Sequence, residues 1–300
     1  MKRFLLRIWL VVPVLLVGIF ALALVAQVHP RLEYILFAKG PFGSTFFRMP
    51  DFAQSNGPHD VVTLGSSTCN RGIDPRPFAQ QGLSAFNLCS SSQTYFNSEY
   101  ILEWSTGLKG NPRCVLMDIY PAIWDNGGLE SVRDLTINHN LSYHTPFQRM
   151  AWATWDIPTI LKACYFGLKR KLSPADRVAR ADLPFKYIEG GLSYTLMPPI
   201  DSLVCAPDTV VMSIKQARAF QRIRQTCEEE GIRLILINPP QLCEEVFEKP
   251  EVMEGLTWIE GNGWPLAKVD TLYYDDHHLR GVGAELYSEW LAAQVVGLIE

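Results

Sequence analysis

Two short segments far apart in the chain carry residue types that together could perform acyl transfer. An apolar run ends at Gly65 and delivers Ser66 and Ser67 onto a sharp turn, and near the C-terminus Asp275 and His278 stand three residues apart. In such a set the carboxylate orients the imidazole, the imidazole accepts the serine proton, and the alkoxide attacks a carbonyl carbon. The pattern therefore predicts a triad of Ser67, His278 and Asp275.

Each fragment also has a simpler interpretation. A Gly-Ser-Ser sequence after a strand often forms a turn and a helix cap, and Asp275 can be a helix N-cap with His278 in the first turn. His277 is the rival base. The i to i+3 spacing favours His278, whereas the adjacent Asp276 and His277 are expected to point apart.

Alternating strands and helices are expected to position these residues. We expect strands at 60–65, 84–89, 113–120, 232–238 and 269–274 and helices at 95–108, 213–230 and 281–299. This alternation predicts a three-layer α/β/α domain with a mainly parallel sheet. Ligands of such sheets bind beyond the carboxyl ends of the strands. Ser67, Asn238, Asp275 and His278 each follow an expected strand and should gather at that edge.

The order of these motifs resembles the SGNH/GDSL hydrolase superfamily, whose fold is similar to that of flavodoxin. The residues that carry the resemblance are Gly65-Ser66-Ser67, the turn Cys89-Ser90-Ser91, and Asp275-x-x-His278-Leu279. The chain is most similar to the membrane-anchored, extracytoplasmic branch, which includes D-alanyl transfer and alginate O-acetylation proteins. The resemblance covers roughly residues 60–125 and 210–295 and implies Ser67 as nucleophile, His278 as base and Asp275 as orienting acid. We expect no cofactor and no metal ion.

Two departures from the family pattern concern the oxyanion hole. The second block normally supplies a glycine N–H, but here the turn is Cys89-Ser90-Ser91. The third block normally carries Gly-x-Asn-Asp, but here the strand ends Asp118-Ile119-Tyr120-Pro121. Losing one oxyanion donor typically costs roughly 10²–10³ in turnover. The candidates for oxyanion or substrate binding are Ser66, Cys89, Ser90 and Asn238, and the backbone N–H groups of Ser67 and Ser90 are the nominated donors.

Two further residues near these motifs need an interpretation. Asp118 lies on an apolar strand and is expected to be a buried, hydrogen-bonded acid. Cys69 is a weaker alternative nucleophile, because it lies two residues after Ser67 and its side chain is expected to face elsewhere.

The N-terminus predicts a membrane anchor. Residues 8–26 are uncharged and almost wholly apolar, and basic residues precede them. This run reaches the ~20 residues that a spanning helix needs and exceeds the ~7–15 residues of a signal-peptide core. The basic flank favours a cytoplasmic N-terminus, so the remaining chain is expected on the extracytoplasmic, periplasmic side. The alternative is a cleaved signal peptide ending near Ala21-Leu22-Ala23.

The expected organisation is an anchor at 1–28, a connector at 29–58 and a hydrolase domain at 59–300 with an insertion at 122–210. A hydrophobic content of 48% with 19% charged residues indicates a folded chain. The net charge of −4 argues against a nucleic-acid partner. None of the seven cysteines forms a C-x-x-C motif; we expect mostly buried thiols, with room for one disulfide of undetermined partners.

Two functions remain open. The first is a serine-dependent acyl ester hydrolase or O-acyltransferase that acts on an acylated glycan of the envelope, an exported glycan or a small acyl ester. The resemblance implies a multispan membrane acyltransferase as its partner. The alternative is a non-catalytic envelope scaffold on the same fold, because the third block is missing and a fold does not fix a function.

Overall fold

The computed structural model describes residues 11–15, 17–18, 21, 45–138, 146–161, 185–203, 205, 210–243 and 247–299. The chain divides into two units, Met1–Phe42 and Gly43–Glu300. In the first unit the described residues are helical. Among the residues that the structure describes, no helix is both long and apolar enough to span a bilayer. Most of the expected anchor lies outside the described residues.

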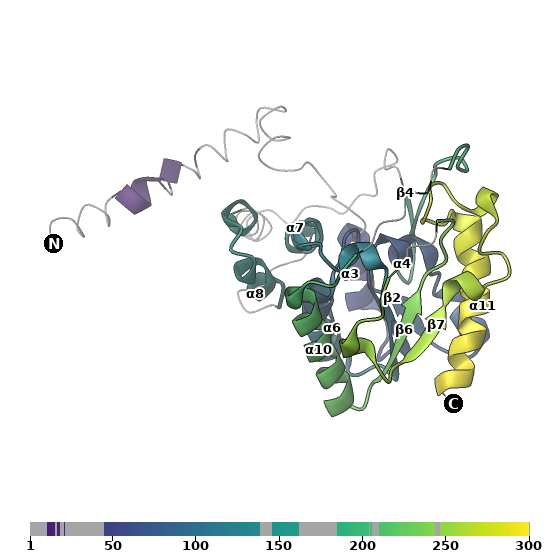
Figure 1. The fold of residues 1–300 in the computed structure, drawn as a ribbon. Coiled ribbons are helices and arrows are strands. Elements are labelled where there is room, and N and C mark those ends of the chain that lie inside the picture. The colour runs from purple at the N-terminus through teal and green to yellow at the C-terminus, as the bar shows by residue number, and fades with distance from the viewer. Residues whose placement is uncertain are drawn as a thin grey trace. The chain divides into compact units, whose positions relative to one another are not determined.

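A five-stranded parallel sheet forms the centre of the second unit (Figure 1). Its strands are β1 (Val61–Leu64), β2 (Ala85–Asn87), β3 (Cys114–Asp118), β6 (Arg233–Asn238) and β7 (Thr257–Glu260). They lie in the order β2-β1-β3-β6-β7, and each neighbouring pair is parallel. Counted along the chain, this is the 2-1-3-4-5 order of flavodoxin-like doubly wound folds. The predicted α/β class with a mainly parallel sheet is confirmed.

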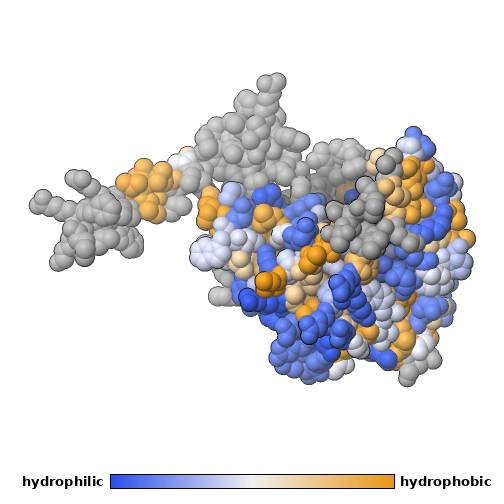
Figure 2. All heavy atoms as spheres, in the orientation of Figure 1, coloured by the Kyte–Doolittle hydropathy of each residue, from blue (hydrophilic) through white to orange (hydrophobic). Residues whose placement is uncertain are grey.

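Helices cover both faces of this sheet. Successive side chains of a strand point to opposite faces, so Val62 and Leu64 enter one apolar cluster while Val61 enters the other. The first cluster packs against α3 (Thr45–Gln54), α6 (Tyr95–Lys109), α7 (Leu129–Asn138), α8 (Pro146–Ala153) and α10 (Ile214–Glu229). The second packs against α4 (Ser67–Gly72), α5 (Arg76–Gln80) and α11 (Gly281–Ile299). The surface around α10 is largely hydrophilic in Figure 2, as expected for an amphipathic helix.

The described part of the expected insertion is integrated into the domain. A 3-10 turn, η1 (Pro121–Ile123), follows β3, and α7 and α8 contribute Val132 and Phe147 to the first apolar cluster. The antiparallel hairpin of β4 (Phe185–Ile188) and β5 (Leu192–Thr195) is tied to β2, because Asn87 N–H donates to the Gly190 carbonyl at 2.8 Å. Residues 139–145 and 162–184 of this region lie outside the described residues.

The prediction of a strand at 269–274 is wrong, and the fifth strand of the sheet is β7 instead. A 3-10 turn, η4 (Asp270–Leu272), occupies the expected strand, and only an isolated bridge joins Tyr273 to Leu279. Asp270 stabilises the turn, since its side chain accepts the Thr271 N–H and its carbonyl accepts the Tyr273 N–H. Two further 3-10 turns, η2 (Glu251–Met253) and η3 (Gly261–Gly263), flank β7.

The expected connector at 29–58 contains a core helix in its second half. The compact unit begins at Gly43, and α3 buries Met49 and Phe52. Arg48 on the same helix is fully buried and donates to the carbonyls of Cys89 and Gly191 and to the Asn70 side chain. The α3 segment therefore ties together helix α4 and the turns that follow β2 and β4.

The cysteines are mostly buried, as expected. Cys69, Cys89, Cys114 and Cys227 are buried free thiols, and Cys164 lies outside the described residues. The single disulfide of the described chain joins Cys205 to Cys243, 38 residues apart.

Replacing Arg48 with Met is expected to lower the free energy of unfolding by about 2–5 kcal/mol, because the buried carbonyls of Cys89 and Gly191 lose their donor. Urea unfolding of the full chain followed by Trp fluorescence measures this loss. The matched control is Arg222→Met, whose ion pair with Glu99 lies on the surface and should change stability by less than about 1 kcal/mol. Equal losses in the two variants would contradict a structural role for Arg48.

Candidate active site

The turn that carries the nucleophile is fixed by Asp118. β1 ends at Leu64, Ser66 is the N-cap of α4 and Ser67 is its first residue. The Oδ2 atom of Asp118 accepts the Ser66 N–H at 2.8 Å, the Ser66 hydroxyl at 2.6 Å and the Thr68 hydroxyl at 2.8 Å. These three donors flank Ser67, so the carboxylate holds the nucleophile position from both sides.

Gly65 allows the close approach of this turn to β3. A Cβ atom at position 65 would lie 2.1 Å from the Asp118 Cβ, a distance that real side chains do not adopt. The backbone φ of +155° is also one that glycine adopts more readily than other residues. The glycine before the two serines is therefore a packing requirement of the site.

Asp118 is the buried, hydrogen-bonded acid that its strand position predicted. Burial raises its pKa, while the hydrogen bonds from Ser66, Tyr120 and Thr68 oppose this, and the net pKa is raised. Its second oxygen accepts the Tyr120 N–H at 2.8 Å. The side chain thus orders both the serine turn and the residues that follow β3.

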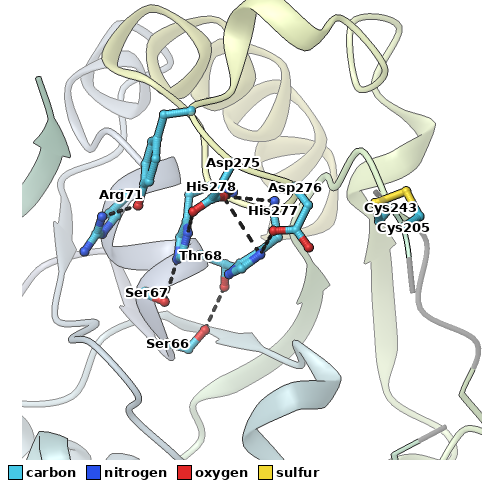
Figure 3. A network of polar contacts seen from close by, with 11 residues as sticks. Ser66, Ser67, Thr68, Arg71, Cys205, Cys243, Asp275, Asp276, His277 and His278 are labelled. Carbon is cyan, nitrogen blue, oxygen red and sulfur yellow. Dashed lines mark hydrogen bonds and ion pairs between the residues drawn. A yellow bond between two sulfur atoms is a disulfide. The ribbon is translucent and has the colours of Figure 1, made fainter. Parts of the chain in front are cut away.

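The structure brings the three predicted catalytic residues into one hydrogen-bonded line (Figure 3). His278 Nε2 lies 2.7 Å from Ser67 Oγ, and His278 Nδ1 lies 2.7 Å from Asp275 Oδ2. Asp275 Oδ1 accepts the backbone N–H groups of His277 and His278. Because α11 begins only at Gly281, Asp275 caps a bend and does not cap the helix.

The electrostatics of this line favour a neutral imidazole. Burial lowers the pKa of His278, and the nearby His277 and Arg71 lower it further against the opposing effect of Asp275, to about 4. Burial alone would raise the pKa of Asp275, but the hydrogen bond and charge of His278, with smaller contributions from His277, lower it to about 2. Near pH 7 His278 is therefore neutral and Asp275 ionised, as a general base and its orienting acid require.

Two residues that the sequence analysis missed support the His278 ring. The Tyr274 ring stacks parallel to it with centroids 5.3 Å apart. Arg71, one helical turn after Ser67, donates to the Tyr274 hydroxyl and lies 5.4 Å from its ring centroid. Arg71 and Tyr274 are 203 residues apart in the sequence, so no local pattern indicated that their side chains meet.

His277 also has an acidic partner. Its Nδ1 lies 2.6 Å from Asp276 Oδ1, and its ring stacks on Tyr120. The expectation that Asp276 and His277 point apart is wrong, because it assumed helical geometry and residues 274–277 form a bend. His278 is nevertheless the imidazole that contacts Ser67.

Three of the four candidates for oxyanion or substrate binding have a backbone N–H that is engaged elsewhere, and the side-chain amide of Asn238 makes one such contact. Ser66 N–H donates to Asp118, and Cys89 N–H donates to the Asn87 side chain at 3.0 Å. Ser90 N–H donates to the Gly65 carbonyl at 3.1 Å, so its nomination as an oxyanion donor is wrong. Asn238 Nδ2 donates to Glu260 at 2.9 Å.

The backbone N–H of Ser67 remains as an oxyanion donor. It is the first amide of α4, and the first amides of a helix have no intrahelical acceptor. Within the described residues no acceptor is found for it.

Two alternative chemistries fit the site less well. Cys69 is fully buried, and burial raises its pKa well above the ordinary thiol value, so it does not supply a thiolate. Asp275, His277 and His278 place ligand atoms within 4.8 Å of one another, which is close enough for a metal ion. However, both ring nitrogens of His278 are hydrogen-bonded to Ser67 and Asp275, so the geometry suits proton transfer better than metal coordination.

Comparison of the chain with protein-family models gives no match, and comparison with curated proteins gives none either.

The pKa of His278 predicts how the reactivity of Ser67 depends on pH. The imidazole can accept the serine proton only when it is neutral, so the rate of Ser67 labelling by a fluorophosphonate should fall on acidification with a midpoint near pH 4. Between pH 6 and 8 the rate of Ser67 labelling should be nearly constant. A midpoint near the ordinary histidine value of about 6.5 would contradict the buried environment. Circular dichroism at each pH distinguishes titration from unfolding.

Replacing Asp118 with Ala should impair both stability and reactivity. The Ser66 N–H and the Ser66 and Thr68 hydroxyls lose their acceptor, which should cost about 2–4 kcal/mol of unfolding free energy. Fluorophosphonate labelling of Ser67 should slow by at least about 10-fold, because a small displacement of the nucleophile is costly. Asp118→Asn keeps one acceptor oxygen and should lose less, so equal effects of the two variants would argue against this role.

Proposed function

We propose that this chain is a serine-dependent acyl ester hydrolase or O-acyltransferase in which Ser67 carries the acyl group. The observation that supports this most is the continuous hydrogen-bonded line from Ser67 Oγ through His278 to Asp275, with both side-chain contacts at 2.7 Å. A neutral, buried and oriented imidazole beside a serine at a strand end is the arrangement that nucleophilic acyl transfer needs.

The reaction proceeds in two halves. His278 accepts the proton of Ser67 as the serine oxygen attacks the acyl carbon, and the protonated imidazole then gives this proton to the departing alcohol oxygen. In the second half water or an acceptor hydroxyl gives its proton to His278 and attacks the acyl carbon, and Ser67 leaves with that proton. Asp275 holds the imidazole and stabilises its charged form. The Ser67 N–H is the donor for the oxyanion in both halves.

Membership of the SGNH superfamily is part of this proposal. It is supported by the 2-1-3-4-5 strand order, by a serine directly after the first strand and by an Asp-x-x-His segment before the last helix. Asp118 lies where the family's third block stands, and it accepts hydrogen bonds from Ser66 and Thr68 of the serine turn rather than contributing an amide donor.

We place the activity on the extracytoplasmic, periplasmic side of the membrane, with an envelope or exported glycan as the acceptor or substrate. The apolar run at 8–26 supports an anchor. The disulfide between Cys205 and Cys243 gives independent support, since such bonds persist in oxidising compartments and are rare in the cytosol. A multispan membrane acyltransferase is the proposed source of acyl groups if the reaction is a transfer.

A non-catalytic scaffold on the same fold is the second candidate. The observation that favours it is the engagement of the Cys89, Ser90 and Asn238 donors in contacts within the domain. The Ser67 N–H is then the one nominated oxyanion donor left, and a single donor supports slow turnover or none.

Covalent labelling separates these candidates. The full-length chain in detergent is treated with a fluorophosphonate and, separately, with p-nitrophenyl acetate. We expect labelling at Ser67 and a p-nitrophenol burst, both abolished in Ser67→Ala, because that change removes the nucleophile. The matched control is Ser202→Ala at an exposed position, which should change neither. A folded wild-type chain that is not labelled would contradict the enzyme proposal and support the scaffold.

A further inference from the structure

A second Asp–His pair lies beside the triad and has no role in the reaction described so far. His277 Nδ1 lies 2.6 Å from Asp276 Oδ1. The rings of His277 and His278 have centroids 3.9 Å apart and are tilted by 42°. Figure 3 shows the two imidazoles next to each other, above the turn that carries Ser66, Ser67 and Thr68.

The carboxylate of Asp276 determines what His277 offers to a ligand. Where the carboxylate accepts the Nδ1–H of a neutral His277 ring, the other ring nitrogen, Nε2, is a hydrogen-bond acceptor. His278 has the same arrangement, with its Nε2 lone pair at Ser67. The His277 side chain is 24% exposed, and no partner of its Nε2 is found within the described part of the chain. A second, oriented hydrogen-bond acceptor therefore lies beside the catalytic base, on a partly exposed side chain.

The second pair is also held rigidly. The His277 ring stacks on Tyr120, with centroids 5.2 Å apart and planes within 19°. The Asp276 carbonyl accepts the Leu242 N–H at 2.8 Å and the Cys243 N–H at 3.4 Å. Cys243 is joined by the disulfide to Cys205. Three separate segments thus fix this pair, whereas an ordinary surface histidine needs none of them.

From this geometry we propose that Asp276 and His277 form the acceptor subsite of the enzyme and select a vicinal diol, the arrangement found in sugars and polyols. The proposal rests on the proposed acyl transfer at Ser67 and adds the acceptor class. The two hydroxyls of a vicinal diol are carried by carbon atoms that are directly bonded to each other, so the two oxygens lie close together. Adjacent imidazoles can therefore each meet one of them, His278 the attacking hydroxyl and His277 its neighbour.

In the transfer step His277 changes no bond. The attacking hydroxyl gives its proton to His278 Nε2 as its oxygen bonds to the acyl carbon. The tetrahedral intermediate then breaks the bond between Ser67 Oγ and that carbon, and Ser67 Oγ takes the proton back from His278. Throughout, the neighbouring hydroxyl donates a hydrogen bond to His277 Nε2. His277 is therefore a binding residue, and its loss should alter acceptor choice while leaving acylation intact.

The test compares propane-1,2-diol with propane-1,3-diol as acceptors for the full-length chain in detergent, with p-nitrophenyl acetate as donor. The two isomers differ in whether their hydroxyls are adjacent. The readout is the ratio of acetylated diol to free acetate, together with the p-nitrophenol burst. We expect the wild type to favour the 1,2-isomer by about 3- to 10-fold, the effect of one hydrogen bond.

The variant is His277→Phe, which keeps a flat ring against Tyr120 and removes both ring nitrogens. It should reduce the 1,2-diol ratio to that of the 1,3-isomer, while Ser67 is still acylated and a p-nitrophenol burst is still seen. Asp276→Asn, which weakens the orientation of the ring, should give an intermediate ratio. The matched control is His59→Phe, which precedes β1 and so lies at the other end of that strand from Ser67. It should keep the wild-type ratio.

Each outcome is decisive. Absence of a burst in the wild type overturns the proposed function and this subsite with it. A normal burst without a preference for the 1,2-diol, or a preference that survives in His277→Phe, overturns the subsite alone. Should His277→Phe fail to fold by circular dichroism, Asp276→Asn replaces it, since the Asp276 side chain is 47% exposed and tolerates the change.

Discussion

The Asp118 carboxylate lies at the carboxyl end of β3 and accepts hydrogen bonds from Ser66 and Thr68 on either side of the nucleophile. β3 is the central strand of the sheet, so this contact ties the serine turn to the middle of the sheet. The other oxygen of Asp118 orders Tyr120, whose ring in turn stacks on His277. One buried acid thereby sets the relative position of the nucleophile turn and of the histidine segment.

Burial disfavours the ionised form of the Asp118 carboxyl group. Burial of the triad has a useful effect, because it makes His278 suitable as a general base. A buried group is favoured in its neutral form unless a partner stabilises its charge. Asp275 has such partners in the His278 ring and two backbone N–H groups, and its pKa falls to about 2. His278 is more buried, lies near His277 and Arg71, and its pKa falls to about 4. The proton on Ser67 therefore faces a base that is ready to receive it across the neutral pH range.

The sequence predicted those parts of the structure that local pattern determines. The strands at Val61–Leu64, Cys114–Asp118 and Arg233–Asn238 are short apolar runs, and the triad follows from the rule that side chains after parallel strands meet at one edge. The strand Thr257–Glu260 was missed because 269–274 has a stronger local β pattern. Only the tertiary pairing of Thr257–Glu260 with β6 decides between them. The prediction that the Ser90 N–H is an oxyanion donor was wrong for a similar reason. The direction of this N–H depends on an acceptor far away in the sequence, the Gly65 carbonyl.

The nucleophile helix α4 is only six residues long, and so short a helix is not stable by itself. Two buried charged side chains hold it from different elements. Asp118 accepts from Ser66 and Thr68 at its start, and Arg48 from α3 donates to Asn70 in its middle. Because Arg48 also donates to the carbonyls of Cys89 and Gly191, the turn after β2 and the β4–β5 hairpin are fixed to the same helix. Loss of either side chain leaves its buried partners without a hydrogen bond, so both residues stabilise the fold and together define one position for Ser67.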